Sequence, residues 1–147
     1  MTDFVAGFMF TPDRRQVALV EKNRPIWQAG LLNGIGGKIE TFDASPVAAL
    51  CREFDEEAGV QTQPDEWQQI ATLDVIGLGT VYFFRAFSSK AHGMKAGTDE
   101  AVGLYDAHPL PENVIANLKW LIPLSLDENI LFDAPIMLSE HAQKKTA

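Results

Sequence analysis

The sequence predicts an α+β domain, because short strand-like segments recur along the chain and one well-bounded amphipathic helix lies among them. The chain has 147 residues, which is enough for one domain with a substantial apolar core. No internal repeat, low-complexity segment or linker divides it. We therefore assign residues 1–147 to a single domain.

The expected strands are apolar segments that are bounded by turn residues. Residues 3–10 and 16–22 alternate in polarity or are rich in Val and Phe, and the turn at Pro12-Asp13 joins them into an expected hairpin. Further strands are expected at 33–39, 67–74, 80–87 and 101–107.

The main helix is expected to follow Ser45 and to end near Ala58. Ser45 is a favourable N-cap, Pro46 suits the first helical position, and Gly59 ends the helix. At about 100° per residue, one apolar stripe can pack into a core. Its members are Val47, Leu50, Cys51, Phe54 and Ala58.

The C-terminal third is less strongly patterned. A second helix is expected over residues 112–126, and Pro123 is expected to kink or split it. Residues 137–147 are expected to form a frayed tail.

Composition excludes several classes of protein. The formal net charge of −8 argues against binding a nucleic-acid polymer, although a nucleotide held through metal ions remains compatible with it. Cys51 is the single cysteine, which excludes an intrachain disulfide and fits a reducing compartment. No apolar run approaches the length of a membrane span, and no basic leader is present. We expect a cytoplasmic protein that does not bind membranes, as a monomer or a homodimer.

Three glutamates on the main helix are the strongest chemical signal. Glu53, Glu56 and Glu57 have the spacing i, i+3, i+4, so they share one helical face. Crowded carboxylates repel one another unless a cation lies between them, and carboxylate oxygens suit Mg²⁺ or Mn²⁺. Arg52 precedes Glu56 by four residues and can orient it. A solvated helix face is the alternative.

A family resemblance follows from these residues. Residues 36–60, GGKIETFDASPVAALCREFDEEAGV, resemble the Nudix box, GX₅EX₇REUXEEXGU with U aliphatic. Gly37 matches the opening glycine, and residues 52–60 match REUXEEXGU with Phe54 at the first U. The chain thus resembles the Nudix hydrolase superfamily, including MutT-like nucleoside triphosphate pyrophosphohydrolases, over about residues 4–126. The resemblance implies the Nudix fold, in which a mixed β-sheet lies between helices.

The resemblance also implies roles for residues. A divalent cation, Mg²⁺ or Mn²⁺, would be held by Glu53, Glu56, Glu57 and the carbonyl of Gly37. Glu100, in the loop before the strand expected at 101–107, is a candidate for a further metal ligand or for the general base. Glu53 and Glu57 are the other candidates for the base. Arg52 would orient the carboxylates, and Lys38 would lie near the phosphates. Solvated acids and a surface lysine are the alternatives for Glu100 and Lys38.

The front half of the box departs from the pattern. One extra residue lies between Gly37 and Arg52, so the expected glutamate falls at Asp43 or Ala44. Thr41-Phe42 replaces the usual Pro-Gly turn. We hypothesise that Asp43 takes the place of the glutamate and supports a slightly bulged loop.

Two asparagines are candidates for contact with a base. Residues 33–38, NGIGGK, resemble the WNGFGGK run of oxidised-purine triphosphatases of the family, which implies that Asn33 contacts the base. Asn117 lies three residues before Trp120, where those enzymes carry an acidic base-reading residue and MutT-type enzymes an amide. Trp120 is expected to pack in the core, and Trp27 and Phe8 are alternative neighbours of the base. Ordinary turn or core packing is the other interpretation of these residues.

The sequence therefore predicts an enzyme that acts on phosphorus-containing anhydrides. The leading hypothesis is metal-dependent hydrolysis of a nucleoside triphosphate, including an oxidised purine such as 8-oxo-dGTP, to the monophosphate and pyrophosphate. The first alternative is a pyrophosphatase of ADP-ribose, a dinucleotide or a nucleotide sugar. The second is a catalytically inactive nucleotide-binding module.

Overall fold

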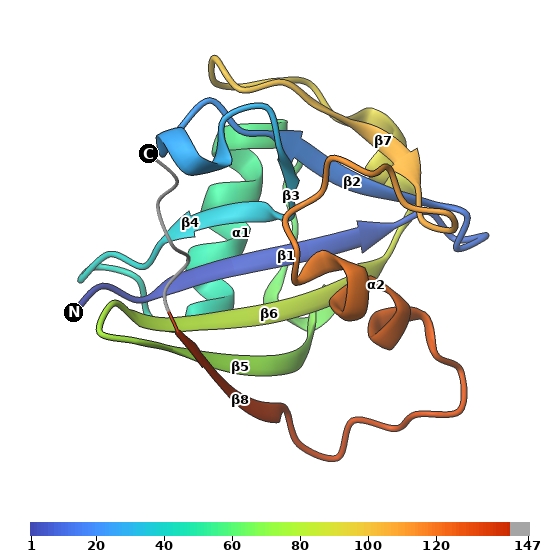
Figure 1. Cartoon of the computed structure of the whole chain (residues 1–147). Helices are drawn as coiled ribbons and strands as arrows, with labels where there is room; N and C mark the ends of the chain where they lie inside the picture. The colour runs from blue at the N-terminus through green and yellow to red at the C-terminus, as the bar shows by residue number, and fades with distance from the viewer. Residues whose placement is uncertain (142–147) are drawn as a thin grey trace.

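A computed structural model of the chain describes residues 1–141. One mixed eight-stranded sheet forms its centre, and the helices α1 and α2 pack on it (Figure 1). The strands are β1 (Phe4–Phe10), β2 (Gln16–Glu21), β3 (Leu32–Asn33), β4 (Ile35–Lys38), β5 (Gln68–Ile76), β6 (Gly79–Phe87), β7 (Val102–Asp106) and β8 (Ile136–His141). The helices are α1 (Pro46–Ala58) and α2 (Leu118–Leu126), with short 3₁₀ segments at Ile26–Gln28, Pro64–Glu66 and Ser89–Gly93.

The sheet has the order β3-β2-β1-β6-β5-β8, with β4 paired to β1 and β7 paired to β2. The pairs β1–β6 and β5–β8 are parallel, and the other pairs are antiparallel. This mixed sheet between two helices confirms the predicted α+β fold class.

Two apolar clusters pack on the sheet, one against each helix. The cluster under α1 includes its fully buried residues Leu50 and Phe54 together with Ile35 of β4. The cluster under α2 includes Leu118, Leu121 and Ile122 together with residues of β1, β2, β5 and β6. Burial of these side chains holds the helices against the strands, and the apolar stripe of α1 thus takes the orientation that the sequence predicts.

The ends of α1 also follow the prediction. The Ser45 hydroxyl accepts a hydrogen bond from the Ala48 N–H at 3.1 Å, and Pro46 is the first helical residue. Gly59 ends the helix in the left-handed conformation, with φ of 66°.

The second helix begins later than predicted. Residues 112–117 are not helical, because this segment is hydrogen-bonded to β3 instead: the Leu32 N–H donates to the Asn113 carbonyl at 2.8 Å, and the Ile115 N–H donates to the Leu32 carbonyl at 2.9 Å. The helix α2 then continues through Pro123 without being split there.

The predicted tail is wrong for residues 137–141. These residues belong to β8, which pairs in parallel with β5, and the ladder of backbone hydrogen bonds accounts for their order. The rest of the predicted tail, 142–147, lies outside the described residues. The segment 33–39 is also divided, into β3 and β4 on either side of Gly34.

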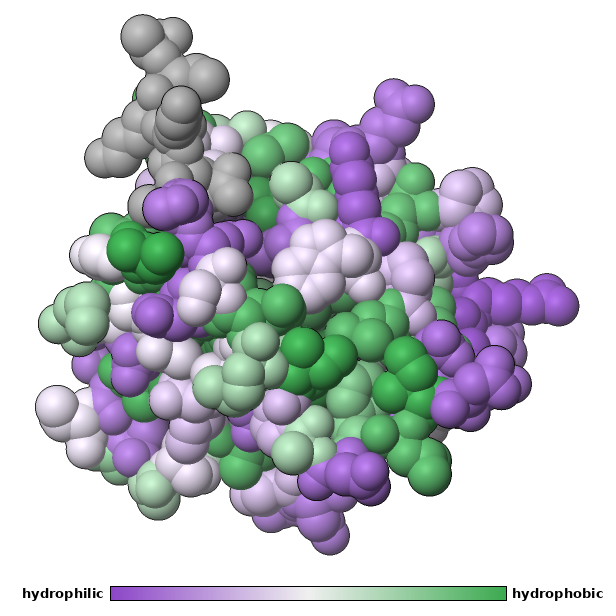
Figure 2. Space-filling view, turned by 60° about the horizontal axis from the view of Figure 1, so that its bottom comes forward, coloured by the Kyte–Doolittle hydropathy of each residue, from purple (hydrophilic) through white to green (hydrophobic). Residues whose placement is uncertain are grey.

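Two features concern the surface of residues 1–141. No helix in this range is both long enough and apolar enough to cross a bilayer. Apolar side chains gather on the face that Figure 2 brings forward from the bottom of Figure 1. Leu131 and Met137 are among the exposed large apolar residues of the chain.

Candidate active site

The acidic helix α1 touches the glycine-containing strand β4 through Glu57. The Gly36 N–H donates a hydrogen bond to the Glu57 carboxylate at 3.1 Å. Glu57 is 9% exposed, which is low for a charged residue. A side chain at position 36 would also lie 1.9 Å from the Val5 carbonyl oxygen, so only glycine lets β4 lie this close to β1.

Burial, and after it the charge of Glu53, raise the pKa of Glu57 to about 7. The charge of Lys22 and the hydrogen bond from Gly36 act in the opposite direction. Glu57 is therefore a carboxyl group whose pKa suits proton transfer near neutral pH.

Glu53 lies against the next glycine of β4. A Cβ atom at Gly37 would come within 2.7–2.8 Å of the Glu53 carboxylate atoms, so the backbone of Gly37 and this carboxylate are in close contact. Burial raises the pKa of Glu53, although Arg52 donates to its carboxylate at 2.9 Å and opposes the rise. Two partly desolvated carboxylates thus lie beside the Gly36-Gly37 backbone.

Arg52 ties the loop before α1 to the helix. Its guanidinium donates to Asp43 through Nε at 2.9 Å and Nη2 at 2.7 Å, and to the Lys38 carbonyl at 3.1 Å. Asp43 in turn accepts a hydrogen bond from the Glu40 N–H at 2.8 Å. The Arg52 guanidinium holds the pKa of Asp43 below its usual value, so Asp43 stays ionised. Asp43 therefore connects the longer loop to Arg52, as the hypothesis of a supporting carboxylate requires.

Glu56 differs from its two neighbours. Its side chain is 57% exposed and accepts a 3.4 Å hydrogen bond from Arg52. Within residues 1–141 no three His, Cys, Asp or Glu side chains are gathered closely enough to hold a metal ion as they stand. The donor chemistry nevertheless fits a hard divalent cation, since the carboxylates of Glu53 and Glu57 lie beside the Gly36-Gly37 backbone and supply oxygen ligands.

Glu100 contacts the two residues that follow β2, Lys22 and Asn23. Its carboxylate accepts hydrogen bonds from Lys22 Nζ at 3.0 Å and from the Asn23 N–H at 2.6 Å, and its side chain is 5% exposed. Burial alone would raise its pKa, but these hydrogen bonds outweigh burial and lower the pKa of Glu100. The charge of Lys22 lowers the pKa of Glu57, and the charge of Glu100 raises it.

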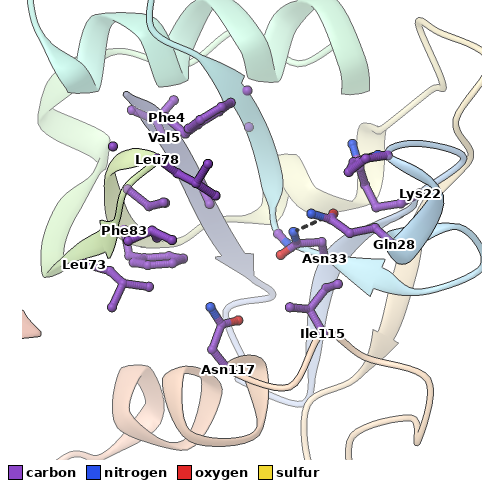
Figure 3. A pocket seen from close by; sticks show the side chains of 18 of the residues that line it. Phe4, Val5, Lys22, Gln28, Asn33, Leu73, Leu78, Phe83, Ile115 and Asn117 are labelled. Atoms are coloured by element: carbon purple, nitrogen blue, oxygen red, sulfur yellow. Dashed lines mark hydrogen bonds between the residues drawn. The ribbon is translucent and has the colours of Figure 1, made fainter. Parts of the chain in front are cut away.

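A cavity of about 370 Å³ opens beside Gly36 and Gly37. Figure 3 shows Leu73, Leu78 and Phe83 on one side of it and Lys22, Gln28 and Asn33 on the other. Asn117 projects into it from the start of α2 (Figure 3). Mostly apolar walls with a few polar groups are typical of a site for a small organic ligand.

Both predicted asparagines line this cavity, Asn33 with a hydrogen-bond donor and Asn117 with an acceptor. The Asn33 Oδ1 atom accepts from the Gly34 N–H at 2.8 Å, so Asn33 presents its Nδ2 donor, which has only a 3.5 Å contact with Gln28. The Asn117 Oδ1 atom is buried and has no hydrogen-bond partner within residues 1–141. A buried acceptor without a partner is costly, and a ligand donor would satisfy it.

The other predicted residues are spread more widely. Trp27 lines the cavity, whereas Phe8 is fully buried in the core and stacks on Phe83. Lys38 is exposed and does not line the cavity. The prediction that Trp120 packs in the core is wrong, because α2 buries Leu118, Leu121 and Ile122 and leaves Trp120 40% exposed.

Sequence reasoning missed three groups that line the cavity, namely Lys22, Gln28 and Glu140. Lys22 ends a predicted strand and could have been considered as a cation near the glutamates. Glu140 lies in the segment that was expected to fray, so no local signal indicated its place.

Comparison with known proteins shows the family and agrees with the fold. The family model described as NUDIX domain matches residues 1–129. No curated protein matches the chain by sequence. Similar solved structures include a MutT from work on Aliivibrio salmonicida and Vibrio cholerae, at 22% identity over 84% of this chain and 96% of that chain, with a TM-score of 0.64.

Two further structures are similar in fold. The NUDIX domain of Shewanella oneidensis NrtR, complexed with ADP ribose, is 20% identical, with 84% of each chain covered and a TM-score of 0.67. A NUDIX hydrolase from Nitrosomonas europaea is 13% identical over 96% of this chain and 79% of that chain, with a TM-score of 0.67.

Proposed function

We propose, from the premise that this chain belongs to the Nudix hydrolase family, that it hydrolyses the pyrophosphate link of a nucleotide with the help of a divalent cation. The observation that carries the proposal is the hydrogen bond from the Gly36 N–H to Glu57 at 3.1 Å. It joins the acidic helix to the strand β4, whose glycines Gly36 and Gly37 line the cavity, and this supports a site in which the carboxylates lie next to the expected ligand.

Glu53 and Glu57 would hold the cation together with Glu56 and the carbonyl of Gly37. When bound, Mg²⁺ or Mn²⁺ would neutralise phosphate charge and lower the pKa of water. Glu57 is the favoured general base among the three candidates, because its carboxylate is buried and its pKa in the metal-free chain is about 7, whereas both oxygens of Glu100 are already hydrogen-bonded. Glu56 can approach its neighbours by side-chain rotation, since it is largely exposed.

The remaining residues of the site would position the carboxylates and the phosphates of the substrate. Arg52, fixed by Asp43, holds the carboxylate of Glu53 in place. Glu100 fixes Lys22 at the edge of the cavity, where its ammonium group can attract a phosphate. We assign Glu100 to this positioning role, because both of its carboxylate oxygens are already hydrogen-bonded. Lys38, exposed near α1, can meet the outer phosphates.

The substrate that we favour is a nucleoside triphosphate, with a modified or oxidised purine among the preferred bases. The donor of Asn33 and the acceptor of Asn117 face the same cavity, and this pairing suits the edge of a purine, which carries both kinds of group. The products would be a nucleoside monophosphate and pyrophosphate.

A second candidate is a pyrophosphatase of ADP-ribose or a related nucleotide. The specific observation in its favour is the similar fold of the NrtR NUDIX domain, which was solved with ADP ribose. A binding module without activity is the third candidate. The three glutamates on one face of α1, Glu53, Glu56 and Glu57, argue against it, since a binding module has little need for three carboxylates there.

The experiment that tests the proposal is a panel of nucleotides with Mg²⁺ or Mn²⁺, in which products are identified by mass. Monophosphate and pyrophosphate from a triphosphate would support the favoured substrate class. Cleavage of ADP-ribose alone would support the second candidate. The Glu57→Gln variant serves as the inactive control, and absence of turnover by the parent chain on every substrate would overturn the proposal.

A further inference from the structure

The last described strand brings a carboxylate to the cavity. Glu140 of β8 pairs in parallel register with Val75 of β5, and both residues line the cavity. The same wall contains Leu73, which pairs with Leu138. Glu140 is thus a charged group in a mainly apolar wall, away from the glutamates of α1 in sequence and in the sheet.

Glu140 and Asn117 both supply hydrogen-bond acceptors to this cavity. An ionised carboxylate can only accept hydrogen bonds, and the buried Oδ1 of Asn117 is also an acceptor. The donors of the cavity include Asn33 Nδ2 and Lys22 Nζ, and these two residues lie across it from Leu73 of β5 (Figure 3). A ligand whose N–H groups are directed toward Glu140 and Asn117 would satisfy these acceptors, whereas a ligand that presents only acceptor atoms there would be repelled.

Partial burial adds to this preference. Burial raises the pKa of Glu140, so part of the water around its carboxylate has already been removed. An N–H donor from a ligand would replace that lost hydration, while an apolar group would remove more of it without compensation.

We propose that Glu140 is a specificity-determining residue, which accepts a hydrogen bond from the exocyclic amino group of a purine base. The inference deepens the proposed function and rests on it for the orientation of the nucleotide. It predicts selection for bases that carry an amino group over otherwise identical bases that lack one.

The test uses two matched substrate pairs. GTP and ITP differ only by the 2-amino group, and ATP and purine riboside triphosphate differ only by the 6-amino group. We expect the unaltered chain to favour the amino-bearing member of at least one pair by about 10–100-fold in kcat/KM, the size of one charged hydrogen bond. In Glu140→Leu this preference is expected to fall to within about 3-fold, mainly through KM.

Two variants complete the design. Glu140→Gln keeps an oxygen acceptor and should retain part of the preference. Asp74→Leu, at an exposed position of β5 that does not line the cavity, should retain all of it. Thermal unfolding of each variant shows whether the fold is kept. An unchanged preference in a folded Glu140→Leu variant, or no preference in either pair in the unaltered chain, would overturn the inference.

A binding measurement separates this inference from the proposed function. Calorimetry compares GMP with IMP, and AMP with purine riboside monophosphate, without metal and without turnover. An amino preference in binding that Glu140→Leu removes would support the inference even if no triphosphate were cleaved. Lack of binding by all four monophosphates, in a chain that also cleaves no triphosphate, would overturn both.

Discussion

Arg52 and Asp43 form a two-pronged ion pair, with distances of 2.9 Å from Nε to Oδ1 and 2.7 Å from Nη2 to Oδ2. The Asp43 side chain is only 4% exposed, so the pair is largely shielded from water on that side. The extra residue in the loop before α1 therefore does not leave Arg52 without a carboxylate partner.

Asp43→Ala is expected to lower the free energy of unfolding by about 2 kcal/mol, because it removes charge-assisted hydrogen bonds from a partly buried guanidinium. It should also lower kcat, since Arg52 would lose the contact that fixes it beside Glu53. Urea unfolding and steady-state kinetics measure the two effects. Asp55→Ala, at an exposed position of α1, should change neither. Unaltered stability and activity in Asp43→Ala would show that the ion pair has no supporting role.

Glu57→Gln is expected to reduce kcat by at least about 100-fold, the usual contribution of a general base. The glutamine oxygen can still accept from the Gly36 N–H, so the fold should be kept. Glu56→Gln should also lose activity, through weaker binding of the cation, which a titration with Mn²⁺ would detect. Asp55→Asn is the matched control on the same helix, and equal losses in it would mean that negative charge on α1, rather than these positions, matters.

The stability of the metal-free chain is expected to depend on the pH through Glu57. Its pKa rises from the usual value of 4.5 to about 7 on folding, so the folded chain holds this proton more tightly than the unfolded chain. Stability from this group is thus greatest below about pH 4.5 and is lost as the pH rises through about 7, by up to about 3 kcal/mol. Asp43 and Glu100 have lowered pKa values, so their contributions change below this window.

Urea midpoints between about pH 5 and pH 8, measured with a chelator, check this dependence. The fall in stability should be smaller in Glu57→Gln, which cannot ionise at this position. Addition of Mg²⁺ should restore stability at the upper end of the range if the cation binds these carboxylates. A fall of the same size in Glu57→Gln would assign it to other groups.

The adjacent glycines of β4 are expected to respond differently to alanine. At Gly36 the new Cβ would lie 1.9 Å from the Val5 carbonyl, which is backbone, so Gly36→Ala should strongly destabilise the fold. At Gly37 it would lie 2.7–2.8 Å from the Glu53 carboxylate, which is the end of a side chain that can move. Gly37→Ala should therefore fold with a similar melting temperature but lose activity. Melting curves and kinetics of the two variants test this expectation. An equal loss of melting temperature in both variants would contradict it.

Features set by residues that are neighbours in the sequence could be predicted, and features set by contacts between distant segments could not. The boundaries and apolar face of α1 could be predicted, because Ser45, Pro46 and Gly59 act on their own neighbours. The start of α2 could not, since residues 113–115 exchange hydrogen bonds with Leu32, far away in sequence. Asn33 and Asn117 were candidates on resemblance, but only the fold brings them to one cavity.

Among the described residues β8 is an edge strand, with β5 as its only neighbour in the sheet. Edge strands open locally at a lower free energy than strands paired on both sides, and their amide hydrogens exchange sooner with solvent. The wall that contains Glu140 should thus detach before the strands β1 and β6 separate. Mild denaturant would then reduce the preference for one base over another while α1 and its carboxylates remained folded. Selectivity would therefore be lost at a lower denaturant concentration than turnover.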